Sequence, residues 1–123
     1  MEVELIVPAR VRPGEPVPIT LHVLNTGPDA VVLGLTGRPV AFDLVVARPD
    51  GTEVWRRLHG TTVPLVLELR RVAAGERLEF TDHWLQVDNA GRTVPPGSYT
   101  VRGHVPAEDL ELDSEPRDLV ISR

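Results

Sequence analysis

The stretch VPITLHVLNTGPD, residues 17–29, decides the fold class. Positions 17, 19, 21 and 23 are apolar and alternate with the residues between them. This alternation predicts a half-buried β-strand, because successive side chains of a strand point to opposite faces. The NTGPD segment that follows, residues 25–29, is rich in residues that favour turns. A short strand ending in a tight turn is the repeating unit of antiparallel β-proteins.

The same unit recurs on both sides of this stretch. Upstream, apolar positions 3, 5 and 7 alternate with Glu2 and Glu4 before the turn at 12–15. Downstream, Phe42, Leu44 and Val46 share one face of a strand that ends in the RPDG turn, and residues 52–57 form the returning strand. Further strands are predicted from alternating positions at 65–70, 78–84, 99–105 and 117–122.

The predicted architecture is a single domain over residues 1–123, all-β, with about seven to nine antiparallel strands in an immunoglobulin-like β-sandwich. Twelve prolines and ten glycines interrupt the chain at short intervals, and no segment has a helical pattern. In the strand at 65–70, the leucines at 65, 67 and 69 share one face. Residues 106–116 are acidic and irregular, and they form either a loop over a sheet edge or a short edge strand.

Composition excludes several classes of function. The net charge of −5 disfavours binding to nucleic acid or to an anionic membrane surface. The chain has no cysteine, which rules out disulfides, thiolate metal sites and a cysteine nucleophile. No apolar run is long enough to span a membrane, and the acidic start of the chain does not resemble a secretory signal, so we expect a cytoplasmic protein.

The residues that catalysis needs are scarce, and we expect no enzyme, metal or cofactor. No serine lies in a Gly-x-Ser-x-Gly motif, and the histidines lack metal-binding spacing. By strand alternation His22, His83 and His104 are expected at the surface, and Asp43 is expected on a solvated face. The five aromatic residues have the phase of core positions, which disfavours a carbohydrate-binding module.

Several motifs together resemble the bacterial intracellular proteinase inhibitor family. These are LNTG at 24–27, FDLVV at 42–46 running into PDGTEVWR at 49–56, AGE at 74–76, the pair Phe80 and Trp84, and VPPGSY at 94–99. The resemblance extends over most of the chain. It implies a small cytoplasmic β-protein that inhibits an intracellular subtilisin-type serine protease, and it carries over no catalytic residue.

An inhibitor of this kind must present a rigid loop that the protease binds but does not cleave productively. The best candidate by composition is Leu58, His59, Gly60, Thr61, Thr62, Val63 and Pro64. Leu58 and Val63 offer apolar side chains to a specificity pocket, and Pro64 stiffens the exit. Two other loops, Val87–Pro96 and Leu33–Pro39, remain candidates. The alternative function is a non-inhibitory interaction or assembly module, which binds another protein or its own copy across a strand edge.

Overall fold

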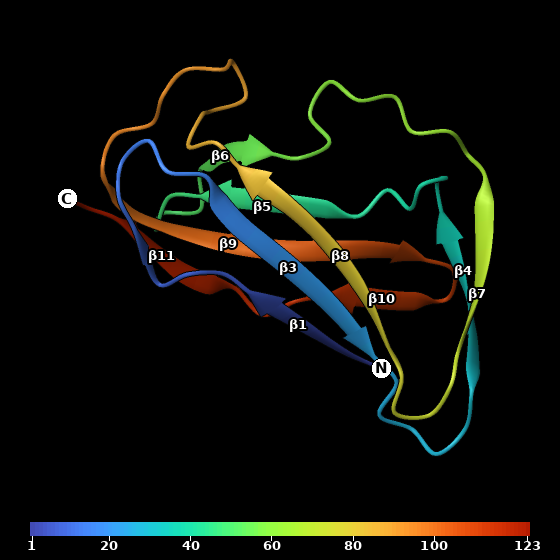
Figure 1. Ribbon diagram of the computed structural model, residues 1–123. Helices are drawn as coiled ribbons and strands as arrows, with labels where there is room; N and C mark the ends of the chain where they lie inside the picture. The colour runs from blue at the N-terminus through green and yellow to red at the C-terminus, as the bar shows by residue number, and fades with distance from the viewer.

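Two antiparallel sheets pack face to face in the computed structural model, which describes residues 1–123 (Figure 1). The smaller sheet has the order β1-β3-β8. Its strands are β1 (Glu2–Ile6), β3 (Val17–Leu24) and β8 (Arg77–Trp84). The predicted strand at 17–24 is confirmed as β3, the central strand of this sheet.

The larger sheet is built around β9 (Gly97–Ala107), which runs behind the smaller sheet in Figure 1. Its path runs β2-β11-β9-β4-β7, with β5, β6 and β10 attached. The bounds of these strands are β2 (Arg10–Val11), β4 (Val31–Thr36), β5 (Asp43–Ala47), β6 (Glu53–Arg56), β7 (Leu67–Val72), β10 (Leu110–Asp113) and β11 (Arg117–Ile121). All pairings are antiparallel except that of β2 with β11.

The all-β sandwich predicted from alternation is confirmed, with eleven strands instead of seven to nine. The three strands that were not predicted are β2 with two residues, β10 with four and β4 with six. The open question about residues 106–116 is answered by β10, which pairs with β9 at the sheet edge. No helix of the structure is long and apolar enough to cross a membrane.

The core lies between the sheets and contains 23 buried apolar residues. Leu21 of β3 and Val101 of β9 are fully buried there, and Trp84 packs edge-on against Tyr99 with ring centroids 5.8 Å apart. The Tyr99 hydroxyl donates a hydrogen bond to the carbonyl oxygen of Pro95, four residues upstream. Burial raises the pKa of this phenol above its ordinary value, because the charged form is disfavoured away from water.

Two surface predictions are wrong for the same physical reason. His22 points away from the core but is buried, because Glu4 of β1 and Glu79 of β8 flank it, with Glu79 Oε1 2.8 Å from His22 Nε2. Asp43 is only 6% exposed, because β6 and β9 flank β5 and Arg56 covers its carboxylate. A polar residue at the centre of a sheet is buried by the longer side chains of its neighbours.

The leucines of the predicted strand at 65–70 do not face the core. Leu65, Leu67 and Leu69 are 95%, 44% and 70% exposed, and the regular strand β7 begins at Leu67. The opposite face carries Glu68 and Arg70, which are half-buried. β7 is the last strand of the larger sheet, and the exposure of Leu67 and Leu69 shows that no layer covers this face of it.

Candidate functional site

The candidate loop of residues 58–64 connects β6 to β7 at one end of the sandwich, and it forms part of the green segment along the top of Figure 1. His59, Gly60, Thr61, Thr62 and Pro64 are exposed. Leu58 and Val63 are half-buried. The loop therefore presents a mainly polar outer surface, and its two apolar side chains are partly withdrawn from solvent.

Local hydrogen bonds fix the start of the loop. The His59 N–H donates to the Arg56 carbonyl oxygen at 3.0 Å, and the Thr61 N–H donates to the Leu58 carbonyl oxygen at 3.0 Å. The Leu58 N–H donates to Asp43 Oδ1 at 3.2 Å. The buried carboxylate of Asp43 thus supports the first turn of the loop from the neighbouring strand.

Arg57, the residue just before the loop, joins it to both sheets. Its Nε lies 2.8 Å from Asp82 Oδ2 on β8, and its Nη1 donates to the Phe42 carbonyl oxygen at 2.7 Å. The guanidinium carbon also lies 3.7 Å from the centroid of the Phe42 ring. Asp82 stands opposite Ile19 in the regular β3–β8 register. Arg57 therefore positions the loop, a role that its sequence neighbours do not indicate.

Leu58 and Val63 line a cleft of about 200 Å³ between the loop and residues 38–41. Pro39 and Val40 form the opposite wall. The two side chains proposed from sequence as anchors thus face a neighbouring loop of the same chain.

Leu65 is the most exposed large apolar residue of the chain, at 95%. The Val66 N–H donates to the Pro64 carbonyl oxygen at 2.9 Å, which places Leu65 at the tip of a three-residue turn. The Gly37 N–H donates to the Val66 carbonyl oxygen at 2.7 Å, so the segment is fixed to the end of β4. The alternating pattern at 65–70 predicts a strand that includes Leu65, and this part of the prediction is wrong, because β7 begins at Leu67. Pro64 is the signal that could have separated it, because proline cannot donate to a β-ladder.

The other two candidate loops are more firmly held within the sandwich. Much of the Leu33–Pro39 segment is the strand β4, where Leu33 and Leu35 are buried, so the prediction of a loop there is largely wrong. The Val87–Pro96 segment is a loop, and Asn89 Oδ1 accepts the Arg56 N–H at 2.9 Å. Gln86 is buried beside it and donates from Nε2 to two carbonyl oxygens of the 12–15 turn.

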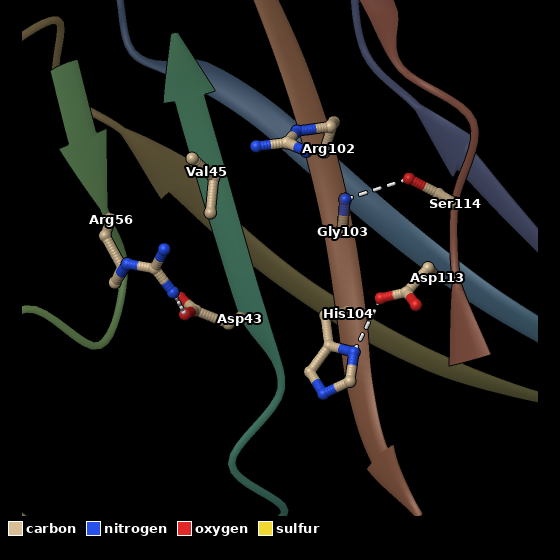
Figure 2. Close-up of a pocket in the computed structure, with 8 residues that line it drawn as sticks. All are labelled: Asp43, Val45, Arg56, Arg102, Gly103, His104, Asp113 and Ser114. Carbon is tan, nitrogen blue, oxygen red and sulfur yellow. Dashed lines mark hydrogen bonds and ion pairs between the residues drawn. The ribbon is translucent and has the colours of Figure 1, made fainter. Parts of the chain in front are cut away.

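A polar hollow of about 400 Å³ lies on the outer face of the larger sheet (Figure 2). Arg56, Asp43, His104 and Asp113 form a row across β6, β5, β9 and β10. Arg56 Nη1 lies 2.8 Å from Asp43 Oδ2, and His104 Nδ1 lies 2.7 Å from Asp113 Oδ1. Each charged group in the row has its partner within the row.

Arg56 also pairs with Glu53 at 2.8 Å, outside the hollow. The hydrogen bond from Arg56 lowers the pKa of the Glu53 carboxyl, and the same hydrogen bond raises the pKa of the Arg56 guanidinium. Both shifts arise because each group favours the charged form of the other. These shifts describe a structural ion pair on the surface of β6.

The hollow does not assemble a nucleophile with a base. Nucleophilic catalysis by serine requires its hydroxyl to lie within hydrogen-bond reach of an imidazole. The Ser114 hydroxyl instead accepts the Gly103 N–H at 2.8 Å, and the His104 ring is bonded to Asp113. No group of three or more His, Asp or Glu side chains lies close enough together to hold a metal ion.

The chain matches a known protein family. The model of the family described as intracellular proteinase inhibitor matches residues 5–110. The match includes the whole candidate loop, Arg57 and the strands that flank them. No curated protein matches the chain in sequence.

Solved structures show similarity in fold. The sporulation control protein Spo0M from Bacillus subtilis matches with a TM-score of 0.59 and 15% identity, over 99% of this chain and 49% of that chain. The CARDB domain of the PF1109 protein from Pyrococcus furiosus matches with a TM-score of 0.52 and 17% identity, over 98% of this chain and 86% of that one. A β-glucosidase from Listeria innocua matches with a TM-score of 0.52 and 16% identity, but this chain covers 16% of it. At these identities the likeness concerns the β-sandwich alone.

Proposed function

This chain belongs to the intracellular proteinase inhibitor family, and from that premise we propose that it inhibits a subtilisin-type serine protease inside the cell. The proposed contact is the loop of residues 58–64 together with the adjoining Leu65. The observation that carries the proposal is the 95% exposed leucine held at the end of a loop that is tied to the sandwich on both sides.

A protease cleft of this type binds a peptide segment through backbone hydrogen bonds and one apolar side chain in a pocket. Binding is tighter when the segment is already ordered, because less conformational entropy is lost. Arg57 holds the start of the segment, and the bond from Gly37 to Val66 holds its end. Leu65 is then the side chain proposed to enter the pocket.

Resistance to cleavage follows from the same contacts. The bond after Val63 is a poor substrate because Pro64 follows it. The residues that follow the Leu65–Val66 peptide bond are fixed to the sandwich. Val66 accepts a hydrogen bond from the Gly37 N–H, and Leu67 pairs with Thr36 in the sheet. If that bond were cut, the new amino terminus would stay beside the acyl group and favour its re-formation.

Inhibition of a purified subtilisin-type protease tests this proposal. Wild-type protein at micromolar excess is expected to suppress hydrolysis of a peptide substrate. Leu65→Ala is expected to weaken inhibition by about 10- to 100-fold, as for a pocket anchor. Leu85→Ala is the matched control, since Leu85 is 66% exposed and begins the other long loop. Leu58→Ala and Val63→Ala test the half-buried pair in the same assay.

The outcomes separate the two functional classes. Unchanged turnover at micromolar excess would contradict inhibition and leave the non-inhibitory interaction module as the function. Inhibition that is lost in Leu85→Ala but retained in Leu65→Ala would move the contact to the Val87–Pro96 side. Equal loss in both variants would point to a contact that spans the two loops.

A further inference from the structure

The antiparallel pair of strands β4 and β7, with the segment that leads into β7, carries an exposed apolar cluster. Eight large apolar residues of the chain are exposed, and five of them lie here. These five, called the β7 cluster below, are Val32, Leu65, Val66, Leu67 and Leu69. Soluble monomers rarely group exposed apolar residues in this way, and such groups mark interaction surfaces.

The backbone beside the cluster is also unpaired. β7 bonds to β4 on one side and is the last strand of the larger sheet on the other, at the right of Figure 1. An open edge of six residues presents N–H and C=O groups to any strand that can approach it. Val32, Leu67 and Leu69 share the outer face of the β4–β7 pair, and the free edge of β7 borders that face.

The sequence of β7 is complementary to itself. When two copies of residues 67–71 are placed antiparallel about Leu69, Glu68 of each copy stands opposite Arg70 of the other. Leu69 of one copy then stands opposite Leu69 of the other, and Leu67 of each copy stands opposite the aliphatic stem of Arg71 of the other. Opposite charges at directly paired positions stabilise a sheet, as do apolar pairs.

The strand β1, which ends the smaller sheet, provides the contrast. An antiparallel copy centred on Val3 places Glu2 opposite Glu4, and one centred on Glu4 places two glutamates face to face. Like charges at paired positions are destabilising. The charge pattern thus favours self-pairing at the β7 edge and opposes it at the β1 edge.

We propose that a second copy of this chain pairs with the β7 edge, forming a two-fold symmetric dimer in which the larger sheets join through antiparallel β7 strands. The pairing is self-complementary, as a two-fold interface requires. Because the strands run in opposite directions, the two loops of residues 58–64 lie at opposite ends of the joint, roughly 20 Å apart along it. Each loop stays open to its own protease, so dimerisation does not depend on the proposed inhibition.

Sedimentation velocity over a range of protein concentrations tests the proposal. The wild-type chain is expected to shift from 13.5 kDa towards twice that mass as concentration rises. Glu68→Arg places two arginines opposite each other, Arg70→Glu places two glutamates opposite each other, and each variant alone is expected to remain a monomer. An equimolar mixture of the two restores opposite charges at both positions and is expected to form a heterodimer.

Glu68 and Arg70 also form a 3.5 Å ion pair within one strand, which each single variant breaks. The mixture does not restore that pair within either chain, so recovery of the dimer in the mixture shows that the pairing between chains is what matters. Circular dichroism of each variant checks that the sandwich is intact. Glu111→Arg, the same charge change on exposed β10, is the matched control and is expected to dimerise normally. A wild-type protein that stays monomeric at all concentrations, or a mixture that stays monomeric while wild type dimerises, would overturn the proposal. A Glu68→Arg variant that dimerises as wild type does would also overturn it, because the pairing of Glu68 with Arg70 would then not lie in the interface.

Discussion

Replacing Arg57 with alanine is expected to lower the free energy of unfolding by about 3 kcal/mol. The side chain joins the two sheets just before the candidate loop. It contacts the Asp82 carboxylate at 2.8 Å, the Phe42 carbonyl oxygen at 2.7 Å and the face of the Phe42 ring at 3.7 Å. All three contacts are lost together in the variant.

The magnitude follows from how exposed each contact is. A hydrogen bond from a charged donor to a partly buried carbonyl contributes about 1.5 kcal/mol or more. The ion pair is worth about 0.5–1 kcal/mol, since the Asp82 side chain is 41% exposed and regains water when Arg57 is removed. The cation–π contact adds about 0.5–1 kcal/mol.

Urea denaturation followed by tryptophan fluorescence measures the change. Arg57→Lys keeps the charge but lacks the planar fork, so its loss is expected to be intermediate. Arg77→Ala removes an exposed arginine at the start of β8 and is expected to change stability by less than about 0.5 kcal/mol. A double-mutant cycle with Asp82→Ala isolates the ion pair. If Arg57→Ala unfolds within about 0.5 kcal/mol of wild type, the account of Arg57 as the link between the sheets is refuted.

Three further changes test the core and the surface charges. Gly103→Ala places a Cβ 2.6 Å from Leu21 Cδ1, and because Leu21 is fully buried we expect a loss of about 1–3 kcal/mol in urea denaturation. Tyr99→Phe removes a hydroxyl bonded to an upstream carbonyl and is expected to cost about 1 kcal/mol. The raised pKa of Tyr99 contributes stability below its ordinary value of 10.0 that is lost as pH rises through the folded value, and the phenylalanine variant should lack this alkaline loss. The lowered pKa of Glu53, caused first by Arg56, contributes stability above the ordinary value of 4.5 that is lost as pH falls through the folded value. The acid limb of a stability–pH profile should therefore be flatter for Glu53→Gln, and an unchanged profile would contradict the pairing.

The sandwich was predictable because alternation is a local property of the chain. The apolar positions of residues 17–24 face the core as β3, and the RPDG turn at 48–51 joins β5 to β6 as expected. The family resemblance was also predictable, since its motifs lie in these strands and turns. Each of these conclusions depends on residues that are close in sequence.

Burial on the outer faces was not predictable in this way. His22 is covered because β1 and β8 flank it on both sides, and Leu69 is exposed because β7 has only β4 beside it, where Gly34, without a side chain, stands opposite Leu69. Alternation identifies which residues share a face, but the position of a strand within its sheet decides whether that face is covered. Arg57 left no local signal, because its partner Asp82 lies 25 residues away in sequence.

The contacts of Arg57 explain how a sandwich can order a loop that belongs to neither of its sheets. A loop held by one sheet can follow the movements of that sheet alone. Arg57 bonds to Asp82 in the smaller sheet and to the Phe42 carbonyl beside β5 in the larger one, so movement of the loop start would disturb the packing between the layers. The rigidity that the proposed inhibitory contact requires is thus supplied by the stability of the whole core.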